Sequence, residues 1–277
     1  MLRVFITKAN GLRQLFDREK IIRTCLKMGV TQKIAIDIVN EVERKLYDGI
    51  PTSKIFKIVF NLLENYKPSV KHFLDLRKAI SLMISKPEFE MFVQILLSFN
   101  GYAVSSNQLI QGKCARHEVD GLARKDGVTF FVEAKHHYHY HTPTGLDESR
   151  IARAVLEDVV EGYELGKNKL KIERAMLVTN TRFSEQAILY GNCRNILQIG
   201  WHSPGKLSLQ NMIEERKVYP LSCIRGLRTE TRIRLVDSGI ILIKQLLSSD
   251  ISKLSRKSGI SSSTLRKTIE KAKNGPF

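Results

Sequence analysis

Three ionisable side chains in the segment HEVDGLARKDGVTFFVEAKHH, residues 117–137, have the types and spacing needed to hydrolyse a phosphate ester. They are Asp120, Glu133 and Lys135. Between them lies Asp126-Gly127, a dipeptide typical of two-residue hairpin turns, with apolar residues on both sides. A turn at that position places Asp120 opposite Glu133 on neighbouring strands. Lys135 then shares a face with Glu133, because side chains alternate along a strand.

Two carboxylates opposed across a hairpin repel each other unless a cation lies between them. A hard divalent ion with oxygen ligands, Mg²⁺ or Mn²⁺, suits such a pair. A solvated polar stripe explains the same residues, as does a purely structural pair between Glu118 and Lys135. The residues alone leave these alternatives open.

The charge of the chain indicates a polyanionic partner. Its 277 residues carry a formal net charge of +17, with a sequence pI of about 9.8, while a hydrophobic share of 43% is ordinary for globular proteins. Residues 217–277 contain 13 lysines and arginines against 4 acidic residues. Nucleic acid is therefore favoured over an acidic membrane surface.

The four cysteines are far apart and form no CxxC pair, which suits reduced thiols in the cytoplasm. No apolar run approaches the roughly 20 residues that span a bilayer, and the first residues lack the apolar core of a signal peptide. We therefore expect a cytoplasmic protein with no membrane partner.

The elements that must position the three residues predict a mixed α/β fold in three domains. Residues 1–84 combine a strand at 2–7 with several helical patterns. Residues 85–220 open with a helix, continue with the hairpin, and then alternate helices with strands, which indicates a mixed sheet. Residues 221–277 are helical and basic.

Asp120 followed by Glu133-Ala134-Lys135 resembles the D…ExK signature of the restriction endonuclease-like superfamily. The preceding helix with Glu90 is similar to the first helix of that fold, which often supplies a further acid. The resemblance implies that Asp120, Glu133 and the Ala134 carbonyl hold Mg²⁺ or Mn²⁺. It also implies that Lys135 orients the attacking water and offsets charge on the phosphate.

The histidines that follow, in the segment HHYHYH, are open to three interpretations: a zinc site, a phosphate contact or a solvated loop. His137 shares a face with Lys135 and is the strongest candidate for a catalytic accessory residue.

The N-terminal segments VFITKANGLRQLFDREKI and YDGIPTSKIFKIV resemble the ATP-cone, a small regulatory domain that senses nucleotide. The resemblance implies ATP or dATP as an allosteric ligand. Lys8 and Lys20 offer positive charge for phosphates, and Thr52 lies at the expected N-terminus of a helix, where free N–H groups favour anions. Without the resemblance, a small helical domain with solvated lysines explains these residues. Residues 1–220 together resemble a family that joins an ATP-cone to a restriction endonuclease-like domain.

The C-terminal segment resembles a helix-hairpin-helix element with its turn at Ser258-Gly259-Ile260. Such elements hold DNA through phosphate contacts, and Arg266, Lys267 and Lys271 would make them. A basic helical pair that only packs on the rest of the chain is the alternative.

We therefore expect a metal-dependent DNA endonuclease that is controlled by nucleotide and acts as a homodimer, as restriction endonuclease-like domains commonly do. The rival hypothesis is a nucleotide-responsive DNA-binding regulator whose nuclease-like fold is inactive.

Overall fold

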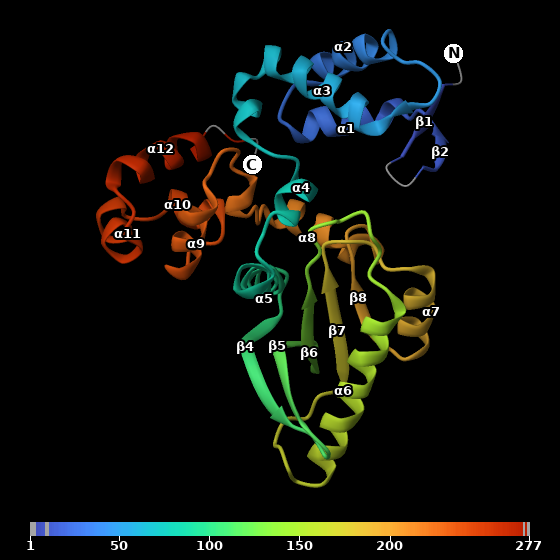
Figure 1. Cartoon of the computed structure of the whole chain (residues 1–277), viewed down its shortest axis with the longest axis vertical. Helices are drawn as coiled ribbons and strands as arrows, with labels where there is room; N and C mark the ends of the chain where they lie inside the picture. Colours follow the sequence, from blue (N-terminus) through green and yellow to red (C-terminus); the bar gives the residue numbers. More distant parts are fainter. Residues whose placement is uncertain (1–3, 9–10, 274, 276–277) are drawn as a thin grey trace. The chain divides into compact units, whose positions relative to one another are not determined.

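Residues 4–8, 11–273 and 275 are described by the computed structural model shown in Figure 1. They divide into two units. The first takes the described residues of Met1–Leu74, Ile224–Gly226 and Ser261–Phe277, and the second takes Asp75–Cys223 and Leu227–Ile260. The segment 221–277 thus contributes to both units, and the predicted boundaries after residues 84 and 220 stay predictions.

The first unit is built on a three-stranded sheet with the order β2-β1-β3. β1 pairs with β2 in antiparallel fashion and with β3 in parallel fashion. Helices cover this sheet and enclose a core of mainly aliphatic side chains. The elements are β1 (Phe5–Thr7), β2 (Arg13–Leu15), α1 (Arg18–Lys27), α2 (Gln32–Glu43), β3 (Ile50–Pro51), α3 (Thr52–Tyr66), the 3-10 turn η1 (Pro68–His72) and α12 (Ser262–Lys273).

The predicted strand at 2–7 is confirmed for Phe5–Thr7, while residues 2 and 3 lie outside the described part of the chain. α2 ends at Glu43, and the residues from 44 to 49 are not helical. In this segment the Asp48 carboxylate accepts a hydrogen bond from the Phe5 N–H (3.1 Å) and pairs with Arg13. This contact fastens the hairpin β1–β2 to the turn that leads into α3.

The second unit contains a mixed five-stranded sheet with the order β4-β5-β6-β7-β8. The first three strands are antiparallel neighbours and the last three are parallel, which confirms the mixed α/β prediction. The strands are β4 (Ala103–Gln111), β5 (Arg116–Lys125), β6 (Val128–Lys135), β7 (Arg174–Thr179) and β8 (Leu197–Ile199).

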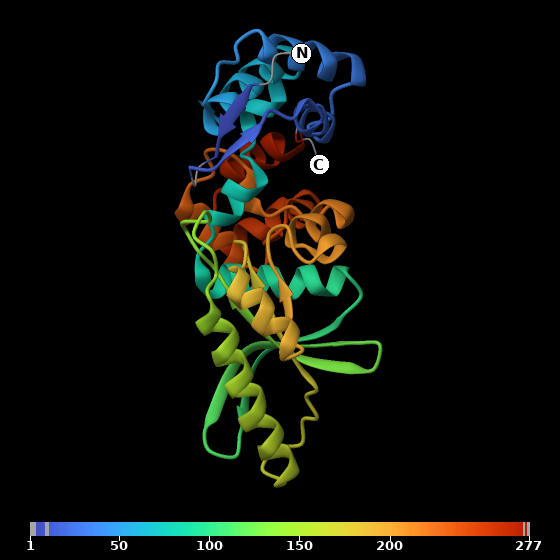
Figure 2. The same cartoon turned by 90° about the vertical axis from the view of Figure 1, so that its right-hand side faces the viewer.

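Helices cover both faces of this sheet, as Figures 1 and 2 show. α5 and α8 pack on the face that presents Phe130 and Val132, whereas α6 and α7 pack on the face that presents Phe131. Each face therefore has an apolar core of its own. The helices and turns of this unit up to residue 223 are α4 (Leu76–Ser81), the π-type turn η2 (Ser85–Phe89), α5 (Glu90–Phe99), α6 (Leu146–Glu164), α7 (Glu185–Cys193), η3 (Gly205–Leu207), α8 (Leu209–Arg216) and η4 (Leu221–Cys223).

The hairpin β5–β6 has the predicted register. Its pairs run from Lys125 with Val128 to Gly121 with Val132. Asp126 and Gly127 both have positive φ, 51° and 80°, as a two-residue type I′ turn requires. A local turn signal therefore determined the register of the hairpin, whose pairing ends at Gly121 and Val132, one position before Asp120 and Glu133.

Sequence analysis missed β4, which pairs with β5 along most of its length. Most side chains of β4 are exposed, including Leu109, and polar residues occupy both of its faces. A strand at the edge of a sheet needs little apolar patterning, so its period-2 signal is weak.

Three helices of the second unit follow residue 227, and two Ser-Gly-Ile turns end α9 and α11. They are α9 (Thr229–Asp237), α10 (Ile243–Leu247) and α11 (Ile251–Ser258). Gly239 and Gly259 have positive φ, 83° and 66°. Lys257 donates a hydrogen bond to the Ser238 carbonyl (2.9 Å), and Arg234 donates one to the Gly259 carbonyl (3.4 Å). Each turn is thus held by a basic side chain near the other turn. No described helix is long and apolar enough to cross a membrane.

A buried ion pair fastens α9 to the residues before α5. Arg232 lies 2.9 Å from the Glu88 carboxylate and donates a hydrogen bond to the Leu82 carbonyl (2.6 Å). Glu88 also accepts from the Ile84 N–H (2.9 Å), and both charged side chains are almost fully buried. Burial raises the pKa of Glu88, and the Arg232 charge opposes that rise.

We expect Arg232→Met to lower the free energy of unfolding by about 3–5 kcal/mol, because it leaves the Glu88 carboxylate buried without its cation. The midpoint of urea denaturation measures the loss. The double variant Glu88→Met/Arg232→Met should recover most of it. Arg153→Met breaks a partly exposed pair with Glu157 and should cost less than about 1 kcal/mol. Equal losses for Arg232→Met and Arg153→Met would contradict this account.

Candidate active site

Asp120 lies just beyond the last paired residues of the hairpin β5–β6. Its side chain is buried, 7% exposed, and one carboxylate oxygen accepts a hydrogen bond from the Ala134 N–H (2.7 Å). Its own carbonyl accepts from the Gln94 side chain of α5 (2.6 Å). Asp120 is therefore held by both the neighbouring strand and the covering helix.

The alternation of side chains along β5 changes at Asp120. Strict alternation would place Val119 on the same face as Ala123, yet Val119 packs in the α6 cluster and Ala123 in the α5 cluster. The change occurs between Val119, which faces α6, and Ala123, which faces α5. It explains how Asp120 comes close to the N-terminus of α5.

Glu133 and Lys135 lie on one face of β6, as predicted. The Lys135 ammonium is 2.8 Å from the Glu133 carboxylate and 3.2 Å from that of Glu148, in the first turn of α6. Sequence analysis missed Glu148, because nothing in the local pattern of α6 relates it to the hairpin. The three side chains form one chain of charges at this end of the strand.

Glu90, the first residue of α5, has a buried side chain that is 4% exposed. The Lys86 ammonium lies 3.1 Å from its carboxylate, 3.7 Å from that of Asp120 and 3.8 Å from that of Glu118. Sequence analysis did not single out Lys86, although its i,i+4 spacing to Glu90 is typical of an ion pair.

The pKa values of the acids show how closely they are grouped. Burial raises the pKa of Glu90, and the nearby charge of Asp120 raises it further. Burial also raises the pKa of Glu133, with Asp120 adding to the rise while Lys135 opposes it. Burial alone would lower the pKa of Lys135, but its contacts with Glu133 and Glu148 raise it overall. Lys135 is thus a charged ammonium near neutral pH.

The donor set fits a hard divalent cation. Asp120 and Glu133 offer carboxylate oxygens. Each carboxylate lies near a lysine ammonium, that of Lys86 for Asp120 and that of Lys135 for Glu133. Among the residues that the structure describes, no three His, Cys, Asp or Glu side chains are grouped to hold a metal ion. Mg²⁺ is usually bound by one or two carboxylates, with water and substrate phosphate completing its shell, so two carboxylates are sufficient.

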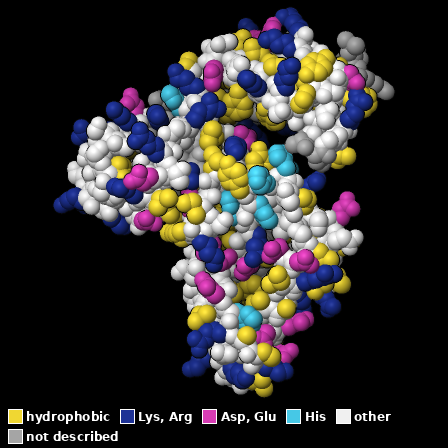
Figure 3. All heavy atoms as spheres, in the orientation of Figure 1, with side chains coloured by type: hydrophobic (Ala, Val, Ile, Leu, Met, Phe, Trp, Pro, Cys, Tyr) yellow, Lys and Arg dark blue, Asp and Glu magenta, His cyan; other side chains and the backbone are white. Residues whose placement is uncertain are grey.

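Within the described part of the chain, the histidine segment after β6 belongs to no group of three or more side chains that could hold zinc. His136 contacts the Ile80 carbonyl through Nε2 (3.0 Å) and the Ser85 hydroxyl through Nδ1 (3.2 Å), and its ring packs beside Phe89. Nε2 of His137 lies 3.1 Å from the Thr144 hydroxyl. Figure 3 shows several histidine side chains beside a mixed group of acidic and basic side chains.

The backbone beyond β6 is fastened by Asn180. Its side-chain oxygen accepts from the His137 N–H (2.8 Å), and its amide donates to the His137 carbonyl (2.7 Å). The pairing of β6 with β7 ends at Lys135 and Thr179. The Asn180 side chain continues the hydrogen bonding to β6 beyond that pair. The hydroxyls of Thr144, Thr179 and Thr181 bond to one another beside it. Lys135 therefore lies at a strand end whose backbone is held by side-chain hydrogen bonds.

The first unit brings two of its three predicted nucleotide-binding residues to one sheet edge. Thr7 of β1 pairs in parallel with Pro51 of β3, so Lys8 and Thr52 follow at the same edge. α3 begins at Thr52, as expected, and has no side-chain cap. Its first N–H groups donate no hydrogen bond to a capping side chain, which suits an anion. Lys20 lies in the first turn of α1, 3.7 Å from the Asp17 carboxylate.

The predicted DNA-contacting residues lie on α12, whose apolar side packs inward. Arg266 and Lys267 are exposed and Lys271 is half-buried. The N–H of Gly259 bonds to the Ser255 carbonyl, and the N–H of Ile260 contacts the Ser258 hydroxyl. Basic side chains rather than these two N–H groups are thus available to phosphate.

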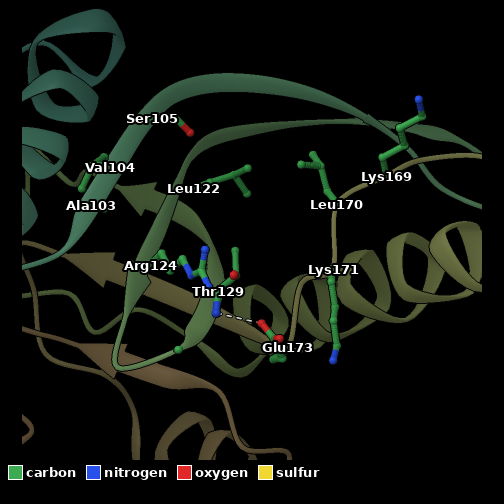
Figure 4. A pocket seen from close by; sticks show the side chains of 11 residues that line it. Ala103, Val104, Ser105, Leu122, Arg124, Thr129, Lys169, Leu170, Lys171 and Glu173 are labelled. Carbon is green, nitrogen blue, oxygen red and sulfur yellow. Dashed lines mark hydrogen bonds between the residues drawn. The ribbon is translucent and has the colours of Figure 1, made fainter.

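A separate groove lies at the turn end of the hairpin. Figure 4 shows Leu122 and Leu170 facing each other across it, while Lys169 and Lys171 extend away. The Thr129 N–H donates to Glu173 at its edge (2.7 Å). None of the predicted site residues lines this groove, so it is distinct from the carboxylate site.

Comparisons with known proteins agree with this arrangement. Three family models match: an ATP cone domain at residues 4–79, a restriction endonuclease domain at 81–198, and an AF1548-like C-terminal domain at 219–274. An uncharacterized protein of Archaeoglobus fulgidus is 31% identical over 178 residues, which are 64% of this chain and 96% of that protein. The chain belongs to the family of that archaeal protein.

A solved structure supports this family membership. It is the crystal structure of the protein of unknown function AF1548, with 30% identity and a TM-score of 0.59. The match covers 66% of this chain and 94% of that one. The order of an ATP-cone, a restriction endonuclease-like domain and a C-terminal helical domain is thereby confirmed.

We expect the stability of the protein to fall as the pH drops below about 6.5, in part because of His136. Burial lowers the pKa of His136, so the unfolded chain takes up a proton before the folded one does. The contribution is present above the unfolded pKa and is lost as pH falls towards the folded pKa. For one histidine the slope is at most about 1.4 kcal/mol per pH unit.

Urea denaturation at pH 7.5 and 5.5 measures this effect, and His136→Gln should reduce the difference between the two midpoints. The control His139→Gln changes an exposed ring and should preserve the wild-type difference. An NMR titration of His136 with a pKa above 6.5 would contradict the assignment.

Proposed function

We propose that this protein is a divalent-metal-dependent endodeoxyribonuclease that is regulated by ATP or dATP bound to its ATP-cone. The observation that supports this most is the grouping of Asp120, Glu133 and Lys135 at one end of the hairpin, in a chain that carries a restriction endonuclease-like domain. Both acids and the lysine of the D…ExK signature are present, and each has hydrogen-bond or ion-pair partners that position its side chain.

Asp120 and Glu133 would hold Mg²⁺ or Mn²⁺ together with the Ala134 carbonyl. The ion would supply a lowered pKa for its bound water and charge stabilisation on the phosphate. Asp120 Oδ2 accepts from the Ala134 N–H, and Oδ1, which lies 3.7 Å from the Lys86 ammonium and outside hydrogen-bonding distance, would bind the ion. Fixing the carboxylate in this way avoids a rearrangement when the ion binds.

Lys135 would orient the attacking water and offset the charge that develops on the phosphate. Its ammonium is held between Glu133 and Glu148 and therefore points to a defined place. His137 is proposed as an accessory residue. Since its Nε2 contacts Thr144, a contact with substrate would use the other ring nitrogen.

We propose DNA as the substrate because of the net charge of +17 and the exposed basic side chains of α12. Arg266, Lys267 and Lys271 would contact phosphates without selecting a sequence. A homodimer would supply two such sites for the two strands of a duplex. Cytoplasmic location remains a prediction from the cysteine pattern.

We expect purified protein with Mg²⁺ or Mn²⁺ to nick supercoiled DNA, with Lys135→Ala lowering the rate about 10²–10³-fold, because one group that stabilises the transition state is lost. Gel electrophoresis of plasmid DNA measures the rate. Asp120→Asn should lose activity as well. Lys113→Ala, which removes a lysine paired with Glu161 elsewhere in the same unit, should cut like the wild type.

Cutting that survives Lys135→Ala and Asp120→Asn would come from another source and would overturn the assignment. DNA binding without cutting under either metal would favour the rival hypothesis, an inactive nuclease-like fold that acts as a regulator. Running the assay with and without ATP on linear, single-stranded and branched DNA shows the direction of regulation.

We expect ATP or dATP to raise the melting temperature, because a ligand bound only to the folded state stabilises it, by about 2.7 kcal/mol at 100 times its Kd. Thermal melts with millimolar nucleotide measure the shift. Lys8→Ala/Lys20→Ala should abolish it, whereas Lys45→Ala/Lys57→Ala removes two exposed charges of the same unit and should preserve it. An unchanged wild-type melt would contradict nucleotide binding.

A further inference from the structure

Lys86 places a positive charge among the carboxylates on the α5 side of the site. Its ammonium lies 3.1 Å from Glu90, 3.7 Å from Asp120 and 3.8 Å from Glu118. Each distance is measured to a carboxylate oxygen. Glu90 is the first residue of α5, and Glu118 and Asp120 lie on β5. A single cation therefore links the start of α5 to β5.

The acids and the lysine differ sharply in burial. The side chains of Glu90 and Asp120 are 4% and 7% exposed, whereas that of Lys86 is 65% exposed. Two buried carboxylates in one site repel each other, and each has lost the water that would stabilise its charge. Lys86 supplies the missing charge from the solvent side, as a small cation would.

The backbone around Lys86 is held on both sides. Glu88 pairs with Arg232 and accepts from the Ile84 N–H (2.9 Å), and Arg232 donates to the Leu82 carbonyl (2.6 Å). The ammonium is thus positioned by a clamped turn rather than by an unattached loop, even though the side chain itself is exposed.

The two lysines of the site divide the acids between them. Lys135 contacts Glu133 (2.8 Å), while Lys86 contacts Glu90. Asp120 belongs to both halves, because its Oδ2 accepts from the Ala134 N–H and its Oδ1 faces Lys86. On the Lys135 side, the carboxylates of Asp120 and Glu133 can bind a divalent ion. On the side of Glu90, the Lys86 ammonium already supplies a positive charge.

We propose that Lys86 takes the place of a second metal ion, so that the site binds one divalent ion, at Asp120 and Glu133. This inference rests on the proposed function of the site and specifies its metal content. The Lys86 ammonium balances the charge of Glu90, its nearest carboxylate at 3.1 Å, and lies farther, 3.7 Å, from Asp120 Oδ1. Removing it leaves the two buried carboxylates of Glu90 and Asp120 without that cation and opens the position between them to a second ion.

Counting bound Mn²⁺ by isothermal titration calorimetry and by the EPR signal of free Mn²⁺ tests this, without any measurement of activity. We expect one ion per chain for the wild type and two for Lys86→Met. Lys86→Arg, which keeps the charge, should bind one. Lys86→Met/Glu90→Gln should return to one, because the second ion needs the Glu90 carboxylate. The matched control Lys113→Met removes a lysine that is paired with Glu161 (2.7 Å) and should bind one.

Two ions in the wild type, or an equal number in the wild type and a folded Lys86→Met, would overturn the inference and leave the proposed function standing. Failure of the wild type to bind Mn²⁺, or binding unchanged by Asp120→Asn, would overturn both. Circular dichroism checks that each variant folds. Should Lys86→Met fail to fold, the wild-type count and Lys86→Gln decide the question.

Discussion

Three carboxylates, those of Glu90, Asp120 and Glu133, lie close together in a largely buried part of the second unit, and the site depends on balancing their charge. Burial raises the pKa of Glu90 and of Glu133, and in both cases Asp120 raises it further. Such a group is stable in its charged form only when cations accompany it. Lys86 and Lys135 fill that requirement within the chain.

The backbone on both sides of the site is held by hydrogen bonds and an ion pair. Asn180 binds both backbone groups of His137 and so holds the end of β6 that carries Lys135. Arg232 and Glu88 hold the turn that carries Lys86. A charge that must offset a buried carboxylate is useful only at a fixed distance, because Coulomb interactions in a protein interior change steeply over a few ångströms.

The candidate site of the first unit has an excess of positive rather than negative charge. Its sheet edge near Lys8 and Thr52 leaves a helix N-terminus without a side-chain cap, which gives an unbalanced positive end. The second unit concentrates negative charge and balances it with lysines. An anion suits the first arrangement and a divalent cation the second. This contrast supports different ligands for the two units.

Sequence analysis succeeded where the signal was local. The Asp126-Gly127 turn determined the register of the hairpin, and alternation placed Lys135 beside Glu133. The helical spacing before Phe99 placed Glu90 at the start of α5. The strand β4 was not predicted, because its mostly exposed residues have weak periodicity.

The sequence by itself therefore determined which acids and which lysine share the end of a hairpin, because turn chemistry and the period of a strand act over a few residues. Only the tertiary structure decided that Lys86 and Glu148 complete the site and that β5 changes its alternation at Asp120. Those contacts join residues far apart in the chain, and they depend on how helices pack against the two faces of the sheet. No local pattern specifies that packing.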